Sequence, residues 1–181
     1  MRGIAQLRAL ARMLTEYNRW ANQRIMADCK DAYNQELQQG AVSDGPSVVS
    51  SLHQALVKDL VWLAWLNGYN PDNTSTPKQN LDWLSFQEER QSADERLMAF
   101  TDAITERQLA LGLVQMLKAE VLDIDPSVGL TLVHLFHQQS HHRAKVQTLL
   151  GQMGISTGDL AFLTFQRITG LGLNKSGRSD R

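Results

Sequence analysis

The sequence predicts an all-α protein built as a four-helix bundle. Apolar residues recur at steps of three and four over four long segments, which is the spacing of amphipathic helices. Stretches rich in Gly, Pro, Asn and Ser separate these segments. With 181 residues, 43% of them hydrophobic, the chain is long enough for one domain with a substantial core. We expect this domain over residues 1–170 and a polar, flexible tail over 171–181.

The first two helices are expected over residues 4–28 and 48–67, where apolar side chains form continuous stripes. The intervening stretch, 29–47, is polar and contains two glycines and a proline, so we interpret it as a break in the helix. Ser47 suits the N-cap of the second helix, and Gly68 suits its C-terminal end.

The second half of the chain is expected to hold two more long helices. A third helix fits residues 84–105, whose many charges indicate a mostly solvated surface. Residues 109–125 are less periodic, and part of them is expected to form a short extended segment, although a helical interpretation stays open. The fourth helix fits 127–151, closed by Gly151 and Gly154, and a short final helix fits 159–169.

Composition and charge exclude several classes of protein. The net charge of −1 and the lack of a basic stripe disfavour nucleic-acid binding. No uninterrupted apolar run approaches the roughly 20 residues needed to span a bilayer, so we expect no membrane association. The single cysteine, Cys29, excludes an intramolecular disulfide and favours a reducing, cytoplasmic location. We interpret Cys29 as a packed residue rather than a catalytic thiol.

The fourth helix carries the clearest chemical signal. Four of the five histidines fall within nine positions of it: His134, His137, His141 and His142. At about 100° per residue, the apolar side chains of this helix define one stripe, and His142 lies roughly 70° from its centre. Gln138 lies at about 110°, while the other three histidines lie at roughly 150° or more. We therefore expect His142 to point inward, with Gln138 beside it.

A second inward histidine comes from another helix. His53 lies on the apolar face of the helix expected over 48–67. A lone histidine in such a stripe is usually a hydrogen-bonded packing residue, but a second imidazole facing it favours metal binding. Helix bundles place metal sites in the core, with ligands from facing helices. His53 and His142 are therefore candidate ligands for one site.

The histidine helix also carries a family resemblance. The segment HLFHQQSHHRAKVQTLLGQMG, residues 134–154, resembles the pattern HLFNHxxHHRGQVxTLLxxxG of the DinB/YfiT-like superfamily of metal-dependent enzymes. The resemblance extends to YNRWAN at 17–22, to Asp59 in the second helix, and to DLAFLTFQR at 159–167. It spans nearly all of residues 5–169 and implies a four-helix bundle of the DinB/YfiT-like type.

The resemblance implies a nickel or zinc site held by three histidines. Carried over position by position, these ligands fall on His53, Gln138 and His142, so this chain has a glutamine where the family has its middle histidine. A glutamine carbonyl is a harder and weaker donor for these metals than an imidazole nitrogen. A weakened or altered metal site and the absence of a physiological metal are both compatible with this substitution.

Two functions follow from the resemblance. The first is an enzyme that binds a divalent metal ion and acts on a small molecule as a thiol-dependent transferase, an isomerase or a hydrolase. In such an enzyme Asp59 is either an acid–base group near the site or a residue in a surface or capping role. The alternative is a metal-free, non-catalytic dimeric binding or stress-response protein that has lost its third ligand at Gln138. Homodimer formation is expected because members of the superfamily often pair. Neither the substrate nor a catalytic residue is identified by the sequence.

Overall fold

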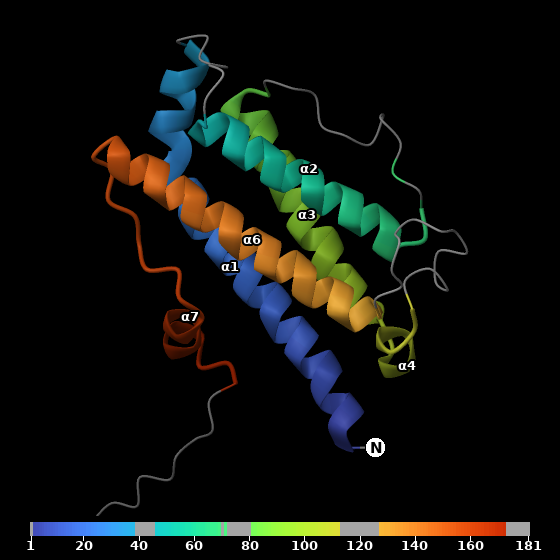
Figure 1. Ribbon diagram of the computed structural model, residues 1–181. Helices are drawn as coiled ribbons and strands as arrows, with labels where there is room; N and C mark the ends of the chain where they lie inside the picture. Colours follow the sequence, from blue (N-terminus) through green and yellow to red (C-terminus); the bar gives the residue numbers. More distant parts are fainter. Residues whose placement is uncertain (1, 39–45, 70, 72–80, 113–126, 173–181) are drawn as a thin grey trace, which may run out of the picture.

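A computed structural model describes residues 2–38, 46–69, 71, 81–112 and 127–172 of the chain (Figure 1). These residues form the helices α1 (Arg2–Gln38), α2 (Val48–Leu66), α3 (Trp83–Ala103), α4 (Glu106–Leu109), α6 (Val128–Gln152) and α7 (Phe162–Thr169). Because the described residues contain no strand, the prediction of an all-α fold is confirmed. An isolated antiparallel bridge joins Gly112 to Ser127, and residues 113–125 of the segment expected to be partly extended, 109–125, lie outside the described residues.

The long helices α1, α2, α3 and α6 enclose one hydrophobic core. Helices α1 and α2 each contact both α3 and α6, and Figure 1 shows α6 crossing the bundle alongside α1 and α2. All four contribute side chains that are almost fully buried, such as Ile25, Leu56, Phe86 and Leu135. The short helix α7 packs on α1, outside this core. The apolar stripes read from the sequence are therefore the faces that meet in the structure.

The predicted helix ends follow from local chemistry. The side chain of Ser47 accepts a hydrogen bond from the Ser50 backbone N–H and so caps α2. Gly68 follows α2 with a φ of +82°, a left-handed conformation that glycine adopts without strain. Gly154 has the same role after α6, with a φ of +77°, whereas Gly151 still belongs to the helix.

The expected end of the first helix was wrong. Instead of breaking near residue 28, α1 continues to Gln38, because Cys29, Ala32 and Tyr33 extend its buried stripe. Cys29 itself has 0% exposed surface, and burial raises the pKa of its thiol to about 12. This thiol is therefore a packed side chain and not an activated nucleophile.

No helix in the described part of the chain combines the length and the apolar character that a membrane span requires.

The extension of α1 brings Glu36 to the start of α2. Its two carboxylate oxygens accept hydrogen bonds from the backbone N–H groups of Val48, at 3.0 Å, and Val49, at 2.8 Å. These N–H groups have no partner within the helix, and a negative charge is favourable at a helix N-terminus. Glu36 therefore joins the end of one helix to the start of the next.

Glu36→Ala should lower the free energy of unfolding by about 1 to 2 kcal/mol, because it removes a charged cap from two backbone donors. Urea denaturation followed by circular dichroism measures this change. The exposed neighbour Gln35 provides the control, and Gln35→Ala should leave stability within roughly 0.5 kcal/mol of the parent. Equal effects of the two substitutions would contradict the capping role.

Candidate functional site

The histidines of α6 divide between core and surface as their angles predict. His142 is 5% exposed, Gln138 is half-buried, and the remaining three histidines are exposed. The inward orientation of His142 is therefore confirmed. Neither ring nitrogen of His142 has a hydrogen-bond partner within the described residues. A buried polar group without a hydrogen bond lowers the free energy of unfolding by roughly 1 to 3 kcal/mol. A bound group that pairs with one of these nitrogens would therefore be stabilising.

A small cavity of about 20 Å³ lies beside His142. That volume suffices for roughly one water-sized group. Residues from all four long helices line it: Asn22, Ile25, Met26, Leu52, Ala55, Phe86, Arg90, Gln139, Arg143 and Val146. Burial, together with the positive charges of Lys58, His141 and Lys145, lowers the pKa of His142 to about 4. At neutral pH the ring is uncharged, and one of its nitrogens carries a free lone pair.

His53 lies half-buried on α2, and Tyr33 fixes its tautomer. The Tyr33 hydroxyl lies 2.8 Å from the Leu81 carbonyl oxygen and 2.7 Å from His53 Nε2. A carbonyl can only accept, so the single phenolic proton goes to Leu81 and His53 Nε2 must carry a proton that it donates to Tyr33. Burial lowers the pKa of His53 and raises that of Tyr33, which keeps both groups neutral. The lone pair of His53 therefore resides on Nδ1.

The three expected ligands differ in their surroundings. His53 and His142 belong to the contacting helices α2 and α6 and have Phe86 as a common neighbour. The Phe86 ring centroid lies 4.9 Å from that of His53, and Phe86 also lines the cavity beside His142. The contact recorded for Gln138 is instead with the exposed His134, at 3.5 Å between Nε2 atoms. The described residues contain no cluster of three or more His, Cys, Asp and Glu side chains suited to a metal ion.

A buried ionic network is centred on Arg90, which lines the cavity beside His142. Arg90 of α3 donates from Nη1 to Asp59 Oδ2, at 2.6 Å, and from Nη2 to Asp94 Oδ1, at 2.9 Å. Burial raises the pKa of both carboxyl groups, and Arg90 opposes that shift. Asp59 is thus a core residue, so of the two roles that the sequence left open for it, the surface or capping role was wrong.

Asn22 connects this network to a second buried arginine. Its amide nitrogen donates to Asp94 Oδ1, at 2.9 Å, and its amide oxygen accepts from Arg143 Nη1, also at 2.9 Å. Arg143 Nη1 donates in addition to Asn18 Oδ1, at 2.6 Å. The guanidinium of Arg143 lies 5.5 Å from the ring centroid of Tyr17, within the range of a cation–π interaction.

Sequence reasoning missed most of this network. The charges of α3 indicated a solvated surface, yet Arg90 and Asp94 are buried. A signal was present, because Asn18 with Asn22 and Arg90 with Asp94 each stand four residues apart. Side chains at that spacing share one helix face. On each of two helices, a pair of polar residues lies within the stripe of apolar residues that faces the core. That pattern could have identified the network.

Arg90→Met should lower the free energy of unfolding by about 3 to 5 kcal/mol, because it leaves Asp59 and Asp94 buried without their counter-charge. Chemical denaturation measures the loss, and Arg96→Met, at an exposed position of the same helix, is the control. Replacing both carboxylates by leucine in the Arg90→Met background should restore much of the stability. A single-variant loss no larger than that of the control would refute the structural role of the network.

Metal-free protein should lose stability as the pH falls from about 6.5 to about 4. Over this window the unfolded state protonates His142, whereas the folded state, with its lowered pKa, does not. The contribution amounts to roughly 2 to 3 kcal/mol. Urea midpoints across this pH range should therefore fall less steeply in His142→Gln than in the parent. His141→Gln, at the exposed neighbouring histidine, should retain the parent slope; if all three slopes agree, His142 does not titrate as described.

Comparison with known proteins supports a family assignment. A model of the DinB family matches residues 7–175, which include both α2 with His53 and α6 with Gln138 and His142. No curated protein and no solved structure matches the chain. Since the matched residues span nearly the whole sequence, this protein belongs to the DinB family.

Proposed function

We propose that this DinB-family protein binds one divalent metal ion, nickel or zinc, and uses it in a reaction on a small molecule. His142 and His53 are the proposed imidazole ligands, and Gln138 is the third. The observation that carries the proposal is the state of His142, an uncharged imidazole whose two buried nitrogens have no hydrogen-bond partner among the described residues. A metal ion bound to one of these nitrogens would provide the partner that the described residues do not.

The donor set suits a borderline metal ion. Two neutral imidazoles are good ligands for zinc and nickel, and an amide oxygen is an acceptable, weaker third. His53 has a feature common among metal-ligating histidines, namely a second ring nitrogen that donates to a fixed acceptor. That acceptor is the Tyr33 hydroxyl, which leaves Nδ1 as the donor atom.

The roles of the chain's own residues follow from their surroundings. When bound, the ion would act as a Lewis acid that polarises a substrate or stabilises a thiolate. Tyr33 orients the His53 ring, and the network centred on Arg90 holds α2, α3 and α6 at a fixed separation behind His142. The cavity beside His142 is too small for a substrate, so the proposed approach is from the half-exposed side of His53. The class of reaction proposed is a transferase, isomerase or hydrolase step on a small molecule.

A second candidate is a metal-free binding or stress-response protein. Two observations favour it. Gln138 stands where the family pattern has a histidine ligand, and the positive charges of Lys58 and Lys145 act on His142, where they oppose a cation. In either case we propose a cytoplasmic homodimer, in line with the single cysteine and the family resemblance. Leu130 and Val133 are exposed apolar side chains of α6 that a second copy would cover.

Elemental analysis of protein purified without a histidine tag, after incubation with zinc or nickel and desalting, distinguishes the two candidates. The metal-binding proposal predicts about one ion per chain, and His53→Ala and His142→Ala should each lose it. His141→Ala, beside His142 but exposed, should retain it. Gln138→His should raise affinity about tenfold or more, because an imidazole replaces a weaker amide donor.

Two results would decide against the metal. The first is a parent protein that remains empty after incubation with either ion. The second is an ion whose binding survives both His53→Ala and His142→Ala, because that ion is held elsewhere. Circular dichroism of each variant verifies that a lost ion does not reflect a lost fold.

A further inference from the structure

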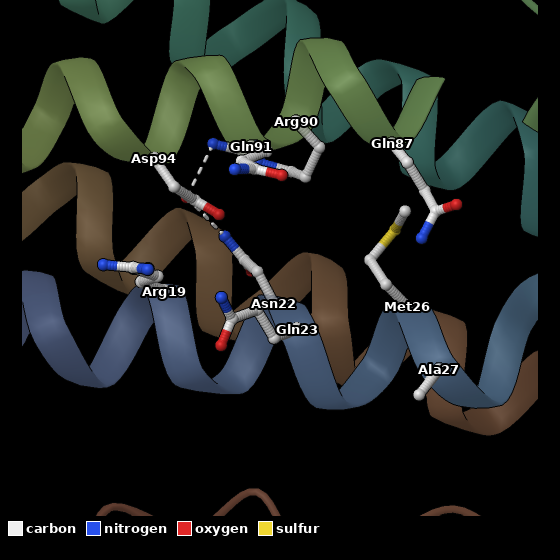
Figure 2. Close-up of a pocket in the computed structure, with 9 residues that line it drawn as sticks. All are labelled: Arg19, Asn22, Gln23, Met26, Ala27, Gln87, Arg90, Gln91 and Asp94. Carbon is white, nitrogen blue, oxygen red and sulfur yellow. Dashed lines mark hydrogen bonds and ion pairs between the residues drawn. The ribbon is translucent and has the colours of Figure 1, made fainter. Parts of the chain in front are cut away.

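A second, larger recess adjoins the cavity beside His142. Figure 2 shows this cleft, of about 190 Å³, between α1 and α3. Its lining residues are Arg19, Asn22, Gln23, Met26, Ala27, Gln87, Arg90, Gln91 and Asp94. Asn22, Met26 and Arg90 line both the cleft and the cavity beside His142. The two spaces therefore adjoin each other at these three side chains.

Two opposite charges at one end of the cleft do not pair with each other, because Asp94 pairs instead with Arg90. Arg19 and Asp94 lie at the same end in Figure 2, yet no ion pair within 4.0 Å joins them in the described structure. The contact recorded for the Arg19 guanidinium is Met98 Sδ, at 3.2 Å, and a thioether does not balance a cation. Asp94 accepts both of its hydrogen bonds on Oδ1, so Oδ2 remains available among the described contacts.

The floor of the cleft has its own unmet donor. Arg90 is 6% exposed, and its Nε has no hydrogen-bond partner within the described residues. Around the rim stand the amides of Gln23, Gln87 and Gln91, and Gln91 Nε2 already donates to Glu95. The cleft thus offers a cation, a free carboxylate oxygen and several amide groups.

We propose that this cleft binds a small amino carboxylate, a zwitterion whose carboxylate faces Arg19 and whose ammonium faces Asp94 Oδ2. A simple cation would meet the positive charge of Arg19, which has no carboxylate partner among the described residues, and a simple anion would leave Asp94 Oδ2 without a donor. Charge-assisted hydrogen bonds at both ends would give such a ligand its orientation. The cleft volume fits a small molecule, and the amide rim suits its polar groups. This inference is independent of the proposed metal.

Titration of the full-length protein with a graded series of amino acids tests the proposal. The probes are glycine, β-alanine, 4-aminobutyrate and 5-aminopentanoate, observed by changes in amide chemical shifts in NMR spectra. We expect saturable binding with an optimum at one chain length, and shifts that map to α1 and α3 around the cleft. Butyrate and butylammonium, each with only one of the two charges, should bind about tenfold or more weakly than 4-aminobutyrate.

Variants of one helix locate the site. Arg19→Gln should weaken binding of the best probe about tenfold or more, because it removes the partner of the carboxylate. Arg24→Gln is the matched control, since Arg24 lies on the same helix outside the cleft, over the Trp20 ring. The proposal is overturned if no probe saturates, if butyrate binds as tightly as 4-aminobutyrate, or if both variants weaken binding equally.

Discussion

The guanidinium of Arg90 is the group on which the rest of the structure depends. It joins Asp59 of α2 to Asp94 of its own helix α3, and Asn22 of α1 then connects Asp94 to Arg143 of α6. Every long helix therefore contributes to one buried polar network. Buried charges are costly unless each has its partner in good geometry. A shift of one helix along another would break such a pairing, so the network selects the register of the bundle, while apolar burial supplies most of the stability.

The charge balance of this network limits which metal ions the region around His142 would suit. Two carboxylates, Asp59 and Asp94, meet two guanidinium groups, Arg90 and Arg143, so these four described side chains together carry no net negative charge. A hard ion such as magnesium or calcium depends on carboxylate ligands that are free to bind it. The free donors here are neutral nitrogens and an amide oxygen, which suit zinc or nickel. The donors of His53 and His142 therefore suit the zinc or nickel ion proposed above better than a hard ion.

The sequence predicted those parts of the fold that follow from local rules. Periodicity identified the long helices, turn chemistry identified Ser47 and Gly68, and helix geometry identified His142 as the inward histidine of α6. The burial of Arg90 was not predicted, because a charged residue on a helix normally faces solvent. Its burial depends on a partner from another helix, Asp59, which the sequence of α3 alone does not show. The same limit applies to Tyr33, whose role depends on a carbonyl many positions away in the chain.

Gln138 contacts His134 through the nitrogen end of its side-chain amide. A glutamine amide has two distinct ends, and only its nitrogen can donate to His134 Nε2. The oxygen, which is the end that binds cations, remains uncommitted within the described contacts. At 3.5 Å the hydrogen bond is long and does not hold the side chain strongly. His134 in turn packs against Trp62, with 5.1 Å between ring centroids. Gln138 is therefore compatible with a ligand role, and the weakness of its donor, rather than its present partner, would limit the affinity of the site.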